Sequence, residues 1–180
     1  MAEVSIVYYS GSGRTAQVAE RVYQGLVAVP GVTARLITVA AAMEDLGQLD
    51  SADTIVFGTP TYMGSVAAPM KAFMDATSQT WYVQGWKDKL AAGFTNSVGL
   101  NGDKLNTLQT LAIFAAQHSM IWISQGLMTG PDQNRLSSWL GLMTQTDQGA
   151  DSPHPTDLAT AEQFGHRIAQ ITLRWVKGQG

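Results

Sequence analysis

Cysteine is absent from the 180-residue chain, which excludes disulfides, thiolate metal sites, iron–sulfur clusters and cysteine nucleophiles. Any redox chemistry would therefore depend on a bound cofactor. Long apolar runs are also missing, because no stretch approaches the roughly 18 consecutive apolar residues of a membrane span. The first ten residues carry Glu3 and no basic segment, so they do not resemble a secretory signal. We therefore expect a cytoplasmic protein with no membrane span.

Charge is scarce as well. Charged residues make up 14% of the chain, against roughly 25% in typical soluble domains. Eleven Lys and Arg residues stand against fourteen Asp and Glu residues, so the formal net charge is -3 and no nucleic-acid partner is expected. The low charge suggests that self-association or a large ligand covers part of the surface. The 45% of hydrophobic residues suits one compact domain that spans residues 1–180.

Hydrophobic patterning predicts alternating strands and helices. Segment 4–9 is β-branched, aromatic and nearly continuous, which is typical of a strand buried on both faces. After Gly13, apolar residues recur every three or four positions, which predicts an amphipathic helix that ends near residues 30–31. Further strands are expected at 32–39, 54–58, 90–95 and 120–124, a short helix or loop at 40–49, and helices at 66–76, 104–118 and 155–175. This alternation predicts an α/β fold with a parallel sheet covered on both faces.

Two segments interrupt the alternation. Segment 78–89 carries Trp81, Tyr82 and Trp86 among polar residues. Segment 125–155 is a connection of about thirty residues, and connections longer than about 15 residues without regular structure are usually functional or disordered. No composition shift or internal repeat marks a domain boundary.

The turn after the first strand has the composition of an anion-binding loop. Residues 10–15 read Ser-Gly-Ser-Gly-Arg-Thr, so successive backbone N–H groups and three hydroxyls can surround an anion at the start of a helix. A P-loop lysine is missing and the spacing is not GxGxxG, so a single phosphomonoester is the expected guest. The alternative is a glycine–serine turn that only caps the helix, with Ser12 as the N-cap.

A second unusual turn favours the binding interpretation. Residues 58–65, which read Gly-Thr-Pro-Thr-Tyr-Met-Gly-Ser, follow the third strand. In a doubly wound sheet of order 2-1-3-4-5, the ends of strands one and three flank the crevice where ligands bind. The two turns are therefore expected to meet at one place.

At these residues the sequence resembles a known family. The first turn matches the flavodoxin phosphate-loop pattern, and Gly58-Thr59-Pro60-Thr61, Gly64 and residues 67–75 are similar to the flavin loop and following helix of WrbA-type NAD(P)H:quinone oxidoreductases. Flavodoxin with its FMN is the established instance of the crevice rule. The similarity continues to about residue 126, while residues 127–155 have no counterpart. The resemblance implies a flavodoxin-like, doubly wound, five-stranded sheet of order 2-1-3-4-5 that binds FMN.

The resemblance also implies which residues serve the cofactor. The loop at 10–15 would hold the phosphate, Pro60 to Gly64 would wrap the edge of the isoalloxazine ring, and a loop after the fourth strand would add contacts. Trp81 and His118 occupy positions that lie beside the exposed ring face in the family. The cofactor-binding residues expected on this basis are Ser10, Gly11, Ser12, Gly13, Arg14, Thr15, Pro60, Thr61, Tyr62, Met63, Gly64, Trp81, Asn96, Ser97, Val98, Gly99 and Gly102. No metal ligand is expected.

His118 is the one expected catalytic residue. A histidine at a helix C-terminus is favoured by the helix dipole and often has no other role. The resemblance implies a hydrogen bond from His118 to a quinone oxygen or to the flavin edge as negative charge develops there. Trp81 and Tyr62 have a corresponding structural alternative as core or oligomer contacts.

The activity that the resemblance implies is two-electron transfer from NAD(P)H through FMN to a quinone or similar acceptor. A flavodoxin-type one-electron carrier is the first alternative, although such carriers usually present a strongly acidic face and a charge of -3 is mild. A non-catalytic FMN-binding regulatory protein is the second, and the long segment 125–155 keeps it open. The family and the low charge together predict a homodimer or homotetramer.

Overall fold

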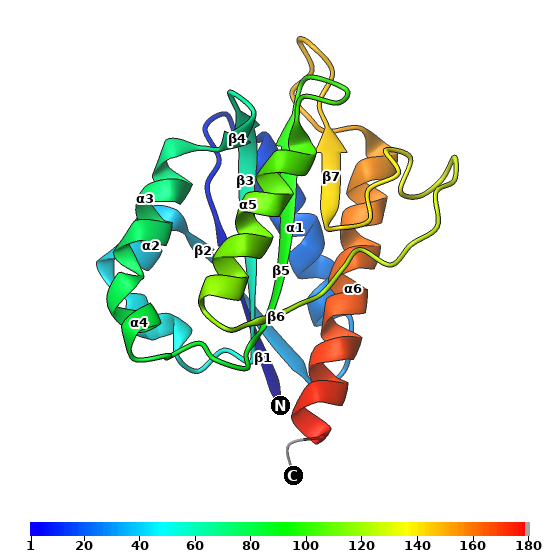
Figure 1. The fold of residues 1–180 in the computed structure, drawn as a ribbon. Coiled ribbons are helices and arrows are strands. Elements are labelled where there is room, and N and C mark those ends of the chain that lie inside the picture. Colours follow the sequence, from blue (N-terminus) through cyan, green and yellow to red (C-terminus); the bar gives the residue numbers. More distant parts are fainter. Residues whose placement is uncertain (179–180) are drawn as a thin grey trace.

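The computed structural model describes residues 1–178, which form a twisted parallel sheet between two layers of helices (Figure 1). The strands of the sheet lie in the order β2-β1-β3-β5-β6, and β1 pairs in parallel with both β2 and β3. Two short strands lie off this path: β4 pairs antiparallel with β3, and β7 pairs in parallel with β5. The bounds are β1 Ala2–Tyr8, β2 Val32–Thr38, β3 Thr54–Tyr62, β4 Ser65–Val66, β5 Leu90–Ser97, β6 Ile121–Trp122 and β7 Leu142–Gln145.

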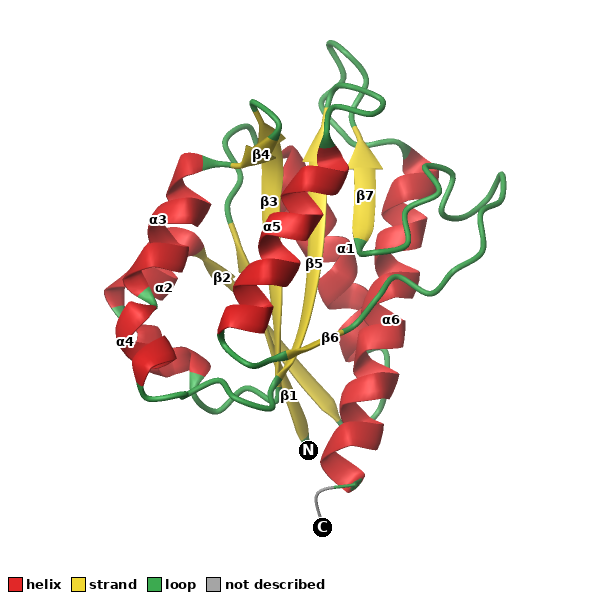
Figure 2. Cartoon of the chain, in the orientation of Figure 1, coloured by secondary structure: helices red, strands yellow, loops and turns green. Residues whose placement is uncertain are grey.

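The fifth strand of the predicted sheet is split in two. β6 pairs with Leu90 and Ala91 at the start of β5, whereas β7 pairs with 94–97 at its end. Between them the chain leaves the sheet and returns through a long loop over 123–141 (Figure 2). The predicted fold class and spatial order are therefore confirmed. The single strand expected at 120–124 is wrong, because hydrophobic patterning identified only the first half of a strand that the loop interrupts.

Helices cover both faces of the sheet, as the alternation predicts. α1 and α6 pack on one face, and α2, α3 and α5 pack on the other (Figure 1). The segment 78–89, which interrupts the alternation in the sequence, contains the short helix α4. The bounds are α1 Arg14–Val27, α2 Val39–Glu44, α3 Ala68–Ala76, α4 Ser78–Tyr82, α5 Lys104–Gln117 and α6 Pro155–Lys177, with a 3-10 turn at Leu46–Leu49.

Helices α1 and α6 approach each other at two glycines. A Cβ atom on Gly25 would overlap the carbonyl oxygen of Glu162, and one on Gly165 would overlap the carbonyl oxygen of Val22. Backbone therefore packs on backbone at this crossing, which closes one face of the core.

The carboxyl ends of β1, β3 and β5 meet at one edge of the sheet, and each helix carries the chain back to the opposite edge (Figure 1). This arrangement gathers the loops after the three strands at one place. Within residues 1–178, no helix combines the length and apolar character needed to cross a membrane.

Candidate functional site

Three loops surround a cavity at the carboxyl edge of the sheet. β1 and β3 are neighbours in register, with Tyr8 opposite Gly58, and β3 and β5 are neighbours with Pro60 opposite Asn96. The two turns that the sequence singles out therefore lie side by side, and the loop after β5 completes the wall. The cavity has a volume of about 360 Å³ and is lined by Ser12, Arg14, Thr15, Pro60, Thr61, Tyr62, Met63, Gly64, Asn96, Ser97, Val98, Gly99 and Gly102.

The first loop presents the amino terminus of α1 to the cavity. Gly13 is the N-cap residue with φ 83°, a backbone conformation that favours glycine, and no side chain caps the helix there. The capping interpretation of Ser12 is therefore wrong. Ser10 Oγ instead accepts from the backbone N–H of Ala16 at 3.2 Å. In the described part of the chain, no protein acceptor takes the N–H groups of Arg14 and Thr15, so these donors are free for an anion.

Not every residue of this loop reaches the cavity. Ser12, Arg14 and Thr15 line it, whereas Ser10, Gly11 and Gly13 shape the turn. Gly11 lies under the Tyr62 side chain, because a Cβ atom built on Gly11 would lie 2.5 Å from the Tyr62 hydroxyl oxygen. A larger residue at position 11 would displace the Tyr62 hydroxyl from this place.

The second loop is a tight hairpin between β3 and β4. Met63 and Gly64 both have positive φ angles, 48° and 79°, as in the type I′ turn that joins antiparallel strands. The hairpin leaves the Met63 side chain fully exposed. Below it, the hydroxyl of Thr61 lies 2.8 Å from the hydroxyls of both Thr95 and Thr107, which fixes the base of the turn.

The third loop is held by a lysine that sequence reasoning missed. Lys104, at the start of α5, is buried and its Nζ donates to Ser97 Oγ at 3.0 Å and to the carbonyls of Gly99 at 2.6 Å and Leu100 at 3.0 Å. Burial lowers the pKa of Lys104 to about 8. No motif marks this residue, since a lysine at the start of a helix is ordinary in sequence.

The cavity suits a phosphate-bearing planar cofactor. The free N–H groups of Arg14 and Thr15 and the Arg14 side chain line one side of the cavity, and the hairpin with Tyr62 lines another. The positive end of the α1 dipole faces the same place as the free donors and adds to their attraction for a phosphate. The residues present therefore fit the FMN that the sequence predicts.

His118 and Trp81 do not lie at this cavity. They line a separate cavity of about 530 Å³, together with Met74, Ile113 and Phe114 among others. The reason is geometric, because α5 begins beside the third loop and its 14 residues carry the chain about 21 Å toward the opposite edge of the sheet. A single copy of the chain therefore places neither side chain at the cavity expected to hold the flavin.

The surroundings of His118 determine its tautomer. Its side chain is 3% exposed, and Nε2 lies 2.9 Å from the Thr77 hydroxyl. That hydroxyl donates its single proton to the Met74 carbonyl at 2.8 Å, so it must accept from His118 Nε2–H. Nδ1 is then a lone-pair acceptor, buried and without a partner among the described residues. His118 so held has no free N–H to donate to a quinone oxygen, and its Nδ1 lone pair is sealed from solvent.

The same burial makes His118 a source of acid sensitivity. Desolvation beside the rings of Trp86 and Phe114 lowers the pKa of His118 from 6.5 to about 4. Between these values the unfolded chain binds a proton that the folded chain excludes, so stability falls as the pH falls from 6.5 to 4. We expect this histidine to account for about 3 kcal/mol of that loss.

Chemical denaturation across pH 4 to 7 measures the effect. His118→Gln is expected to show a flatter dependence of the unfolding free energy on pH than the unmodified chain. His166→Gln, which changes an exposed histidine, serves as the control and should keep the original slope. Equal slopes in the His118 variant and the unmodified chain would contradict the assignment.

An anion-binding helix terminus and a hairpin loop at the first and third strands of this sheet order define a flavodoxin-like mononucleotide-binding protein. The sequence profile of the NADPH-dependent FMN reductase family matches residues 40–134, more than half of the chain. The chain belongs to this family.

Individual relatives agree with that assignment over nearly the whole length. Flavodoxin FldP of Pseudomonas aeruginosa is 39% identical over 95% of this chain and 97% of its own. An NAD(P)H dehydrogenase (quinone) of Geobacter sulfurreducens is 31% identical over 95% of this chain and 98% of its own. Among solved structures, a flavodoxin, WrbA-like protein from Agrobacterium tumefaciens superposes with a TM-score of 0.79 at 37% identity, covering 97% of this chain and 99% of the other.

These matches confirm several predictions made from the residues. They confirm the resemblance to WrbA-type proteins, the flavodoxin-like fold, and the class of an oxidoreductase that uses FMN with NAD(P)H as electron donor. The electron acceptor and the roles of individual side chains stay predictions.

Proposed function

We propose that the chain is an FMN-dependent enzyme that transfers two electrons from NAD(P)H to a quinone or a similar small acceptor. The observation that carries the proposal is the cavity at the ends of β1, β3 and β5, where free backbone donors of α1 face the hairpin at Tyr62. Relatives named NAD(P)H dehydrogenase (quinone) support the choice of acceptor. A cytoplasmic location, where reduced nicotinamides are made and used, accords with this activity.

In this proposal the protein binds and orients while the cofactor supplies the redox chemistry. Bound there, FMN would supply the two-electron chemistry between the nicotinamide and the acceptor. The N–H groups of Arg14 and Thr15, the Ser12 hydroxyl and the Arg14 guanidinium would hold the phosphate. Backbone groups between Pro60 and Gly64 and the loop from Asn96 to Gly102, which Lys104 keeps in shape, would hold the ring.

The exposed side of the cavity would serve both substrates in turn. Tyr62 is 47% exposed and the hairpin tip beside it is open to solvent, so a planar substrate can approach from that side. No side chain has to act as a nucleophile, which agrees with a chain that lacks cysteine. A single shared approach predicts ping-pong kinetics.

We further propose that the chain forms a homodimer or homotetramer in which Trp81 packs against the flavin of a neighbouring copy. Large apolar side chains stand exposed around Trp81, including Tyr82, Val83 and Ile113, as expected for a surface that another copy covers. Mixing Trp81→Ala with a flavin-free variant should then give more activity than either variant has alone. A chain that sediments as a monomer at micromolar concentration would contradict this part of the proposal.

The test of the activity is a steady-state assay with NADH or NADPH and a panel of quinones. In the absence of oxygen, flavin-loaded protein should oxidise more than one equivalent of nicotinamide only when a quinone is present, with the parallel double-reciprocal lines of ping-pong kinetics. Nicotinamide oxidation that does not depend on a quinone would contradict the proposed acceptor.

A one-electron carrier is the second candidate, and the similarity to flavodoxin FldP favours it. A carrier should form a stable blue semiquinone on reductive titration and should show no NAD(P)H turnover. A non-catalytic regulatory protein is the third, and it predicts protein that stays colourless after addition of FMN. The assay and the titration together separate all three.

A further inference from the structure

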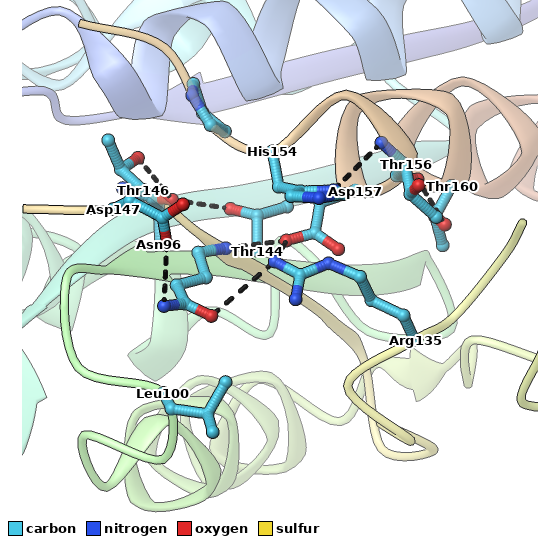
Figure 3. Close-up of polar contacts among 12 residues, drawn as sticks. Asn96, Leu100, Arg135, Thr144, Thr146, Asp147, His154, Thr156, Asp157 and Thr160 are labelled. Atoms are coloured by element: carbon cyan, nitrogen blue, oxygen red, sulfur yellow. Dashed lines mark hydrogen bonds and ion pairs between the residues drawn. The ribbon is translucent and has the colours of Figure 1, made fainter. Parts of the chain in front are cut away.

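The buried amide of Asn96 has one end fixed by protein groups. Asn96 ends the buried part of β5 and is 4% exposed. Its Oδ1 accepts from Thr144 Oγ1 at 2.8 Å and from Thr146 Oγ1 at 3.2 Å. Figure 3 shows both threonines beside Asn96, and each threonine is completely buried. The two hydroxyls therefore set the rotation of the amide.

The other end of this amide has no protein partner. Within residues 1–178, Nδ2 of Asn96 donates to no protein atom, and it is not among the polar atoms sealed from solvent. Asn96 lines the cofactor cavity beside Pro60, its register partner on β3. The two N–H donors of Nδ2 are thus unpaired and accessible on a side chain that is otherwise buried, so an acceptor on a ligand in the adjoining cavity would satisfy them.

Thr144 and Thr146 are positioned by β7, the second half of the split strand. Thr144 lies on β7, and β7 is tied to α6 because the backbone N–H of Gln145 donates to Asp157 Oδ2 at 2.9 Å. Arg135, from the long loop over 123–141, donates to the same oxygen at 2.9 Å (Figure 3). Asp157 is 2% exposed. The loop that interrupts the sheet therefore returns to a fixed point beside Asn96.

We propose that Thr144 and Thr146 are positioning residues, which hold the Asn96 amide so that Nδ2 donates a hydrogen bond to the bound flavin. This inference rests on the proposed function, since it takes FMN as the occupant of the cavity. It assigns a cofactor role to β7, an element that hydrophobic patterning did not reveal. It also makes the segment 127–155 part of the binding site through two hydroxyls rather than through direct ligand contact.

The test compares FMN affinity among variants, measured by quenching of flavin fluorescence on titration of apoprotein. The double variant Thr144→Val and Thr146→Val keeps the side-chain volumes but removes both hydroxyls, so FMN should bind about tenfold more weakly. The corresponding double serine variant keeps the hydroxyls and should restore the affinity. Asn96→Asp can still accept from both threonines but offers no donor, so it should bind FMN at least as weakly as the valine variant.

Thr172→Val is the matched control. Thr172 is a buried threonine whose hydroxyl lies 2.7 Å from that of Thr54, at the start of β3 and away from the cavity. It should lose stability without losing FMN affinity. The inference would be overturned if the double valine variant bound FMN as tightly as the unmodified chain. It would also be overturned if the double serine variant bound FMN as weakly as the double valine variant. Either result would leave the proposed function intact. An unmodified chain that binds no FMN would overturn both.

Discussion

Replacement of Ser12 by aspartate is expected to weaken FMN binding by at least about 100-fold. Ser12 lines the cavity at the amino terminus of α1, where the free N–H groups of Arg14 and Thr15 attract an anion. A carboxylate there would occupy those donors and repel the phosphate, and two charges 4 Å apart near a protein surface interact by about 4 kcal/mol. Titration of apoprotein with FMN, followed by flavin fluorescence, measures the loss.

The fold should tolerate this change because Ser12 is exposed and makes no capping hydrogen bond. Ser51→Asp is the matched control, since it adds the same charge at an exposed serine just before β3, at the opposite edge of the sheet. The control should bind FMN like the unmodified chain. If Ser12→Asp also binds FMN normally, the phosphate does not lie at this loop.

Replacement of Gly165 by valine is expected to lower the free energy of unfolding by about 3 kcal/mol or more. A Cβ atom at this position would overlap the carbonyl oxygen of Val22 on α1, and backbone cannot move aside as a side chain can. The helices would have to separate, which exposes apolar side chains that they bury together, such as Val22 and Phe164. The midpoint of urea or thermal denaturation measures the effect.

Gly130→Ala is the control for this prediction. A Cβ atom on Gly130 would meet its nearest neighbour, Gln133 Cγ, at 3.9 Å, which is ordinary contact. Its stability should stay within about 0.5 kcal/mol of the unmodified chain. Equal denaturation midpoints for the Gly165 variant and this control would show that α1 and α6 do not pack as closely as the structure has them.

Most of the fold could be predicted because buried strands and amphipathic helices have distinct periodicities. The segments near 4–9 and 54–58 are continuous apolar runs, and the structure extends the second of these to Tyr62 because its turn continues as a hairpin. The interrupted fifth strand could not be predicted. β7 has only four residues, Leu-Met-Thr-Gln, and its pairing with β5 depends on a contact between distant parts of the chain.

The candidate site likewise has a part that could be predicted from the sequence and a part that could not. The loops at 10–15 and 58–65 were predictable because glycine and hydroxyl residues at a strand-to-helix turn have a direct chemical meaning. Lys104 and Thr144 were not, because their roles come from partners that only the folded chain brings near. The distance of His118 from the cavity of its own chain follows from the topology, since a residue between a helix end and the next strand belongs to the edge of the sheet opposite the ligand site.

The cofactor site alone does not decide which chemistry this fold carries. The same three strand ends can bind FMN in a carrier or in an enzyme, so the fold alone does not decide between them. What distinguishes the two is access to the ring, which the proposed contact with another copy of the chain would change. The exposed apolar surface around Trp81 is therefore as important to the proposed activity as the cavity itself.

The central claim is that the amino terminus of α1 binds the phosphate of FMN, and the most direct test is the ratio of the dissociation constants of riboflavin and FMN for the unmodified apoprotein. Riboflavin has the same ring and ribityl chain but no phosphate. We expect riboflavin to bind at least about 100-fold more weakly, because the free donors of Arg14 and Thr15 then have no anion to bind. Equal dissociation constants for the two flavins would contradict it.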